Sequence, residues 1–113
     1  MDGQYRKIEI NEFVAGGKGK VILRHILNEG ELNGKCRLYA EVTLAPGCSI
    51  GEHPHHGETE TYYILKGTGT YSDNGEKRPV QPGDITFCAD GNTHGLENTG
   101  TEDLVFMALI ING

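Results

Sequence analysis

Three of the five histidines in this 113-residue chain lie within four positions of one another, and a glutamate follows shortly after. They are His53, His55 and His56, followed by Glu60. Imidazole nitrogens and carboxylate oxygens together suit divalent first-row transition metals. In an extended strand the side chains at positions i and i+2 point to the same face, so His53 and His55 can approach one ion together. The cluster therefore indicates part of a metal site.

The residues around this pair differ in how well they could join it. His56 has the opposite parity, so we expect it to face away unless the chain turns early at Gly57. Glu60 lies beyond that turn, on the next expected strand, where it could return a carboxylate to the same inner face. Glu52 and Glu58 are alternative carboxylates, but flanking surface charge is the simpler interpretation of both.

A further ligand would have to come from a distant part of the sequence, where the remaining histidines are His25 and His94. His94 is the better candidate because it follows Gly91 at the head of an expected strand. His25 lies in the middle of another expected strand, where a core or surface histidine is more common. We therefore take His94 as the additional candidate ligand.

The elements that must position these residues are predicted to be β-strands. Seventeen glycines interrupt the chain, which disfavours long helices. The run from Leu38 to Leu44 alternates apolar and polar residues, as in a strand with one buried face. Asn74 and Gly75 suit a two-residue hairpin turn in which both positions accept positive φ. About nine strands are expected, over 21–27, 35–44, 49–56, 60–66, 68–73, 76–80, 84–88, 94–98 and 104–111.

Short strands at this spacing predict an all-β fold, a sandwich or a barrel. Residues 21–113 form the single expected barrel domain. Residues 1–20 are expected to form an N-terminal arm, and the segment 5–14 within it could supply a strand for a dimer contact. The length leaves no room for a second domain.

Nine positions between 47 and 98 agree in type and spacing with two sequence motifs of the cupin family. The first motif reads Gly, five residues, His-x-His, four residues, Glu, six residues, Gly. Ala89 stands where the second motif usually has proline, which concerns the shape of a loop and no ligand. The chain thus resembles a single-copy cupin at Gly47, His53, His55, Glu60, Gly67, Gly83, Gly91, His94 and Asn98.

The resemblance implies a small jelly-roll barrel in which His53, His55, Glu60 and His94 point inward and hold one divalent metal ion. Iron, manganese, nickel, cobalt, copper and zinc all suit these ligands, and affinity order does not choose among them. Four protein ligands would close a tetrahedral zinc site. An octahedral ion would keep two positions open for a substrate or dioxygen.

Five further residues on the motif strands are candidates for the barrel interior. Tyr62, Tyr71, Thr86 and Phe87 are expected to line a pocket, although each would serve equally well as a plain core residue. Asn98 ends the second motif, and a side-chain amide bonded to the backbone is a better interpretation of it than a substrate contact.

By this resemblance, the leading hypothesis is a metal-dependent enzyme acting on a small organic molecule, of the dioxygenase, isomerase or decarboxylase type. The alternative is a non-catalytic module that binds a metal or a metabolite, such as a sensor. No catalytic residue is assigned beyond the metal ligands. By analogy with other small cupins, we expect a homodimer.

Charge, hydropathy and cysteine spacing exclude several classes. The net charge is −6, and no basic cluster is long enough to follow a nucleic-acid backbone. No apolar run approaches the length of about 18 residues that indicates a membrane span, so we expect a cytoplasmic protein. Cys36, Cys48 and Cys88 lack CxxC spacing and are best read as buried apolar residues. Cys48 and Cys88 adjoin the motifs, so a thiol role for these two stays open.

Overall fold

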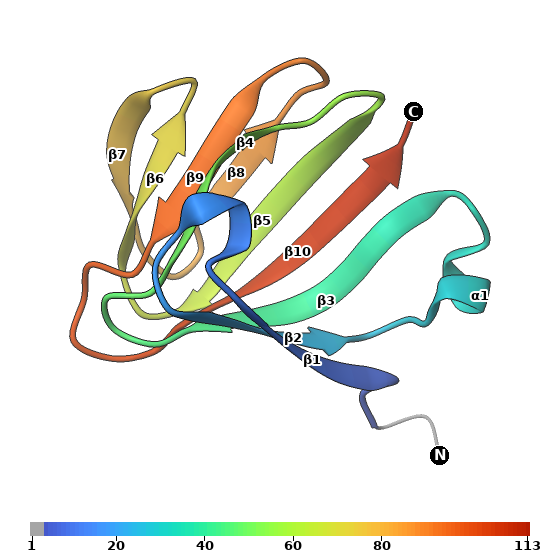
Figure 1. The fold of residues 1–113 in the computed structure, drawn as a ribbon, viewed down its shortest axis with the longest axis horizontal. Helices are drawn as coiled ribbons and strands as arrows, with labels where there is room; N and C mark the ends of the chain where they lie inside the picture. The colour runs from blue at the N-terminus through green and yellow to red at the C-terminus, as the bar shows by residue number, and fades with distance from the viewer. Residues whose placement is uncertain (1–3) are drawn as a thin grey trace.

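Residues 4–113 are described by a computed structural model, in which two antiparallel sheets face each other (Figure 1). The larger sheet has the order β1-β2-β3-β10-β5-β8 and the smaller one β4-β9-β6-β7. The expected all-β jelly roll is confirmed, and the described residues hold ten strands where about nine were expected. The first three positions of the N-terminal arm lie outside the described residues. The strands are β1 (Lys7–Glu12), β2 (Lys20–His25), β3 (Cys36–Leu44), β4 (Ser49–Pro54), β5 (Glu58–Lys66), β6 (Gly69–Asp73), β7 (Glu76–Val80), β8 (Ile85–Cys88), β9 (Thr93–Glu97) and β10 (Leu104–Asn112).

The core lies between the two sheets and follows from the alternation along the central strands. In β5, Glu60, Tyr62 and Ile64 point inward, and the adjacent strand β10 adds Leu104 and Phe106. The strand β10 pairs with β3 on one side and β5 on the other, as its nearly continuous apolar sequence predicted for a central strand. Glu60 is thus a buried polar residue beside apolar neighbours in the inward row of β5.

The hairpin between β6 and β7 has the turn that its dipeptide predicted. Asn74 and Gly75 have φ angles of 51° and 87°, so both occupy the left-handed region. A type I′ turn requires positive φ at both central positions, and its twist matches the flanking strands. The turn sets the register in which Asp73 pairs with Glu76.

A short 3-10 turn, η1 (Val14–Gly16), lies against β4. Two glycines permit this approach. A β-carbon added to Gly17 would lie 2.2 Å from the carbonyl oxygen of Ser49, and one added to Gly51 would lie 2.1 Å from that of Ala15. The two backbone segments therefore touch without intervening side chains.

A one-turn helix, α1 (Glu29–Leu32), joins β2 to β3 and was not expected from the sequence. Asn28 caps it by accepting a hydrogen bond from the Glu31 N–H, and the Glu31 carboxylate accepts one from the Asn28 N–H. The same carboxylate accepts two hydrogen bonds from Arg6, at 2.8 Å and 3.0 Å. These contacts tie the chain just before β1 to the β2–β3 connection.

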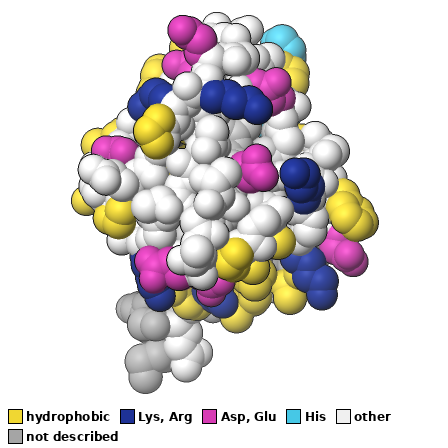
Figure 2. Space-filling view, turned by 90° about the vertical axis from the view of Figure 1, so that its left-hand side faces the viewer, with side chains coloured by type: hydrophobic (Ala, Val, Ile, Leu, Met, Phe, Trp, Pro, Cys, Tyr) yellow, Lys and Arg dark blue, Asp and Glu magenta, His cyan; other side chains and the backbone are white. Residues whose placement is uncertain are grey.

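The described residues contain no helix that is both long and apolar enough to span a membrane. On the face shown in Figure 2, Lys and Arg side chains are interspersed with Asp and Glu, and neither sign forms a stripe. The charge pattern on this face accords with the interpretation of the sequence.

Candidate metal centre

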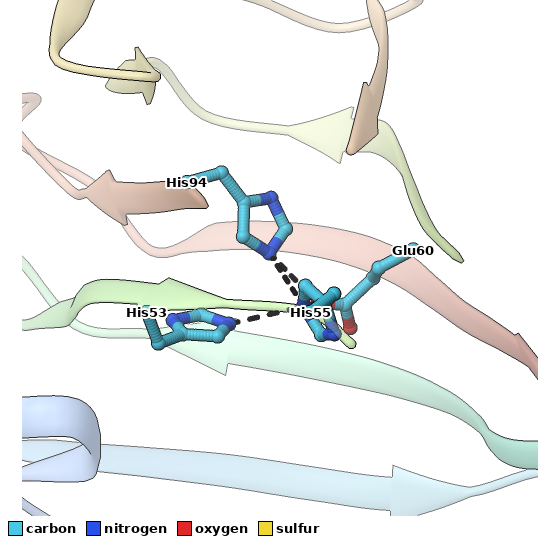
Figure 3. A group of neighbouring side chains, drawn as sticks. All are labelled: His53, His55, Glu60 and His94. Atoms are coloured by element: carbon cyan, nitrogen blue, oxygen red, sulfur yellow. Dashed lines mark hydrogen bonds and ion pairs between the residues drawn. The ribbon is translucent and has the colours of Figure 1, made fainter. Parts of the chain in front are cut away.

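Three strands from both sheets bring His53, His55, Glu60 and His94 together, and we call these four residues the ligand cluster (Figure 3). His53 and His94 are register partners on β4 and β9 of the smaller sheet. His55 follows the end of β4, and its N–H donates to the Asn92 carbonyl. Glu60 comes from β5 of the larger sheet. The cluster therefore joins the two layers.

A β-bulge in β4 turns His53 toward the interior. Ile50 pairs with Leu96 and His53 with His94, so β4 uses three steps where β9 uses two. Residues three apart would otherwise face opposite sides of a strand, yet both Ile50 and His53 line the interior cavity. The carbonyl of Gly51, within the bulge, accepts a hydrogen bond from His53 Nδ1 at 2.8 Å.

The ligand atoms of the cluster all lie within 4.8 Å of one another. The Nε2 atoms of His55 and His94 each lie 2.9 Å from Glu60 Oε1, and they are 3.0 Å apart. His53 Nε2 lies 3.8 Å from the same oxygen. Two ligands at right angles around an ion, with bonds of about 2.1 Å, would be about 3.0 Å apart. The spacing of the cluster thus fits a first-row metal.

The outer nitrogen of each imidazole has its own partner, which fixes the direction of the inner lone pair. His53 Nδ1 must carry the proton because the Gly51 carbonyl can only accept. His55 Nδ1 donates to the Glu58 carboxylate, and the Tyr71 hydroxyl, 3.0 Å from His94 Nδ1, can accept from that nitrogen. With Nδ1 protonated, each neutral ring turns the lone pair of Nε2 toward the cluster. Three nitrogens and one carboxylate oxygen then converge on one point, as metal ligands do.

The charges within the cluster shift its pKa values in directions that suit this role. Burial raises the pKa of Glu60, but its contacts with His53 and His94 outweigh this and lower it to about 2. Burial likewise lowers the pKa of His53, yet the nearby Glu60 carboxylate and the hydrogen bond to the Gly51 carbonyl raise it overall. The pKa of His94 is lowered by burial. Near neutral pH, Glu60 is therefore ionised and His94 is neutral.

The cluster opens into a cavity of about 330 Å³ between the sheets. His53, His55 and Glu60 line one part of it, and Arg37 and Asn11 are the other polar lining residues. The remaining lining residues are apolar or aromatic, and we call the whole space the ligand cavity; they are Val14, Ala15, Val21, Leu23, Leu38, Val42, Ile50, Pro54, Tyr62, Phe106, Ala108 and Ile110.

The five residues expected to lie near the pocket have different surroundings. Tyr62 lines the cavity and stacks on the His94 ring, with centroids 5.0 Å apart. Tyr71 and Thr86 are buried in the core and do not line the cavity. Asn98 donates to two backbone carbonyls and accepts from a backbone N–H. The expectation for Phe87 was wrong, because adjacent residues of β8 point to opposite faces and its side chain is 57% exposed on the outer one.

The alternative ligands lie outside the cluster. His56 is exposed, as its parity indicated, and Glu52 is also exposed, with its carboxylate bonded to Ser72. His25 pairs with Glu9 at 2.9 Å. Neither Cys48 nor Cys88 lines the ligand cavity, and their roles stay open. The structure thus brings together the four positions that the motif spacing singled out.

Sequence reasoning missed the carboxylate that supports His55. Glu58, interpreted as surface charge, accepts hydrogen bonds from His55 Nδ1 and from Arg37, and the pKa of its carboxyl is lowered to about 2, chiefly by Arg37. A signal was available, because Glu58 is two residues before Glu60 and so has the same parity in β5.

Arg37 carried no comparable signal. Ile110 pairs with Leu38 and Ile111 with Cys36, so Arg37 is the extra residue of a bulge in β3. A bulge lets a side chain depart from the regular alternation of its strand. Arg37 reaches the cavity rim and bonds Glu58 at 2.8 Å and 2.7 Å.

Comparison with known proteins gives a consistent result. A family model described as the cupin domain matches residues 40–110. An oxalate-binding protein from Thermotoga maritima is 48% identical over 96 residues, which cover 85% of this chain and 79% of that protein.

Solved structures agree with the fold. A crystal structure described as a predicted oxalate decarboxylase from Thermotoga maritima has a TM-score of 0.93 and 42% identity, covering 100% of this chain and 97% of that one. A cupin 2 conserved barrel domain protein from Salinispora arenicola has a TM-score of 0.73 at 21% identity, covering 95% and 82% of the two chains. The second likeness concerns the fold alone.

Proposed function

The chain belongs to the cupin family, and from this we propose that it binds one divalent first-row metal ion through the ligand cluster and a small organic acid at that metal. The observation that carries the proposal is the convergence of three Nε2 lone pairs and the Glu60 carboxylate beside a largely apolar cavity. When bound, the metal would act as a Lewis acid toward a ligand oxygen.

The residues around the cluster orient its ligands and bury His55, Glu60 and His94. Glu58 and Tyr71 hold the outer nitrogens of His55 and His94, which limits rotation of both rings. Tyr62 stacks on His94 and closes the cluster on the side of the core. The apolar lining lowers the local dielectric, which strengthens the attraction between the metal and an anionic ligand.

The organic acid is inferred from the relatives and from the metal chemistry together. Proteins named for binding oxalate, or as a predicted oxalate decarboxylase, are 48% and 42% identical to this chain. Four protein ligands leave two positions open on an octahedral ion, and two oxygens of one acid can fill them. Binding without turnover is the primary function we propose. Glu60 is the only carboxylate among the described residues that line the cavity, and as a member of the cluster it would not be free to act as a general acid or base.

Elemental analysis tests the metal, and calorimetry tests the acid. Protein purified without a histidine tag should contain close to one metal ion per chain, and His94→Ala should lose most of it. The matched control is His56→Ala, which removes an exposed histidine outside the cluster. Oxalate should bind the loaded protein and should not bind metal-free protein. Full metal content in His94→Ala would contradict the proposal.

A second candidate function is decarboxylation of such an acid, favoured by the likeness to the predicted oxalate decarboxylase. Dioxygenase or isomerase chemistry would use the same metal, so the assays are run side by side. Metal-loaded protein is incubated with oxalate or 2-oxo acids while carbon dioxide release and oxygen uptake are measured. Product formation that disappears in His94→Ala would show an enzyme, whereas tight binding without product would show a binding protein.

We also propose a homodimer that forms through the outer face of the larger sheet. Tyr63 on β5 and Ile85 on β8 are register partners, and they are 45% and 63% exposed. Leu65 and Phe87 extend this apolar face along the same two strands. Light scattering should give twice the chain mass, and Ile85→Asp should give a monomer that retains its metal.

A further inference from the structure

We propose that the acid this site selects is a monoanionic 2-oxo carboxylate with an apolar side chain, in preference to a small dianion such as oxalate. The inference rests on the proposed metal and deepens it by naming the ligand class. Two independent features carry it: the charge around the ligand cluster and the apolar walls of the same cavity.

With a metal bound, the site would carry one net positive charge, which a ligand with one negative charge would balance. A divalent ion and the Glu60 carboxylate sum to one positive charge if the three imidazoles are neutral. Arg37 does not change this sum, because the negative charge of the Glu58 carboxylate, which accepts two hydrogen bonds from it, cancels its positive charge. A monoanion would leave the cavity neutral, whereas a dianion would leave one uncompensated negative charge among apolar residues. Such burial is unfavourable unless the charge is paired.

The lining of the cavity beyond the cluster is mostly apolar, whereas both carboxylates of a chelated oxalate would stay at the metal. The apolar lining side chains come from both sheets and from η1, and the larger ones include Val14, Val21, Leu23, Leu38, Ile50 and Phe106. A short dianion at the metal would touch few of them and would leave apolar space unfilled. An apolar side chain extending from the metal would fill that space, and each buried CH₂ group would tighten binding by about fourfold.

The 2-oxo acid follows from combining these features with the open positions of the metal. One carboxylate oxygen and the adjacent keto oxygen can occupy two neighbouring positions of an octahedral ion. The side chain on the keto carbon then points away from the charged end of the ligand, toward the apolar walls. One molecule would thus coordinate the metal, balance the charge of the site and pack against the apolar lining.

Calorimetry on the manganese-loaded full chain tests the selection. The ligands are oxalate, pyruvate and 4-methyl-2-oxopentanoate, which differ in charge and in the size of the apolar part. We expect 4-methyl-2-oxopentanoate to bind at least about tenfold more tightly than pyruvate and more tightly than oxalate. Equal affinities for the two monoanions, or tightest binding of oxalate, would overturn the inference.

A cavity variant shows where the apolar part binds. Leu38→Ala should reduce the advantage of 4-methyl-2-oxopentanoate over pyruvate several-fold, and it should leave pyruvate affinity nearly unchanged. Leu32→Ala, which shortens a leucine of α1 outside the cavity, is the control. Equal losses for both acids in Leu38→Ala would place the apolar part elsewhere and contradict the model. Circular dichroism of each variant checks that the fold is retained, and the wild-type ligand series decides the question if Leu38→Ala does not fold.

Failure of this inference can be told apart from failure of the proposed function. Metal content of the same samples is measured before each titration. If the metal is present and the apolar part has no effect, the ligand class is wrong and the metal site stands. If no metal is retained, or no acid binds to loaded protein, both proposals fail.

Discussion

His55 Nδ1 donates a hydrogen bond to Glu58, which in turn accepts two hydrogen bonds from Arg37. Glu58 is not a member of the ligand cluster, yet it determines which nitrogen of His55 faces the cluster. Carboxylates in this position commonly fix the tautomer of a ligand histidine and increase its basicity. The chain Arg37–Glu58–His55 therefore links an exposed cation to the buried cluster.

Removing Glu58 should weaken metal binding without removing a ligand. We expect Glu58→Ala to lower metal affinity by about 10- to 100-fold, and Glu58→Gln to lower it less because the amide oxygen still accepts from His55. Competition with a chromophoric chelator measures the affinity. Glu76→Gln, on the exposed hairpin, is the control. An unchanged affinity in Glu58→Ala would remove Glu58 from the account of the site.

Metal affinity should fall as the pH falls, because protons and the metal compete for the same imidazole nitrogens. The pKa of His53 is raised, so on acidification its ring takes up a proton before that of His94. The pKa of His94 is lowered by burial, so it remains available to the metal until lower pH. Titrations between about pH 5 and pH 8 should show a progressive loss of affinity. Affinity that does not vary over this range would be incompatible with histidine ligands.

The packing between the sheets can be tested at Ile64, which is fully buried in β5. Ile64→Ala should lower the free energy of unfolding by about 2 to 5 kcal/mol, because it removes apolar contacts and leaves a cavity. Ile64→Val removes a single methylene and should cost about 0.5 to 1.5 kcal/mol. Urea denaturation of metal-free protein measures both. Equal effects of the two substitutions would argue against tight packing at this position.

The Arg6–Glu31 ion pair should stabilise the fold at neutral pH and cease to do so in acid. The hydrogen bonds from Arg6, with that from Asn28, lower the pKa of Glu31 from 4.5 to about 2. A lowered carboxyl pKa stabilises the folded state above the unfolded value, and this stabilisation is lost as the pH falls from 4.5 toward about 2.

Urea denaturation at several pH values checks this behaviour. Wild type should be more stable than Glu31→Gln near neutral pH, and the difference should shrink steadily with acidification. Glu29→Gln, in the same helix turn, should not reproduce the pattern. A difference that stays constant down to acid pH would assign the effect of the substitution to packing or capping in place of charge.

The cluster could be predicted because motif spacing determines it. The i, i+2 relation of His53 and His55 and the distance to His94 follow from strands and turns that the sequence marks with glycine. Phe87 was misplaced because Thr86 and Phe87 were assigned to one pocket, although neighbours in a strand cannot share a face. Glu58 was missed because a charged residue beside a turn resembles any solvent-exposed carboxylate.

Other parts of the molecule depend on tertiary contacts that no local pattern specifies. The bulge at Arg37 arises where β3 pairs with β10, about 70 residues further along the chain, and so it leaves no local sequence signal. The helix α1 is short, and its capping by Asn28 became evident only with the fold. The strand β1 lay within the arm that was expected, but its pairing with β2 is a property of the assembled sheet.

The close contact between η1 and β4 also affects the size of the ligand cavity. Gly17 and Gly51 allow the two backbones to touch, and Val14 and Ala15 of the same turn form part of the cavity wall. A side chain at either glycine would clash with the facing backbone and push this turn away from β4. The absence of a side chain at these two glycines therefore sets the width of the cavity on this side, and substitutions there could enlarge it without changing any residue of the ligand cluster.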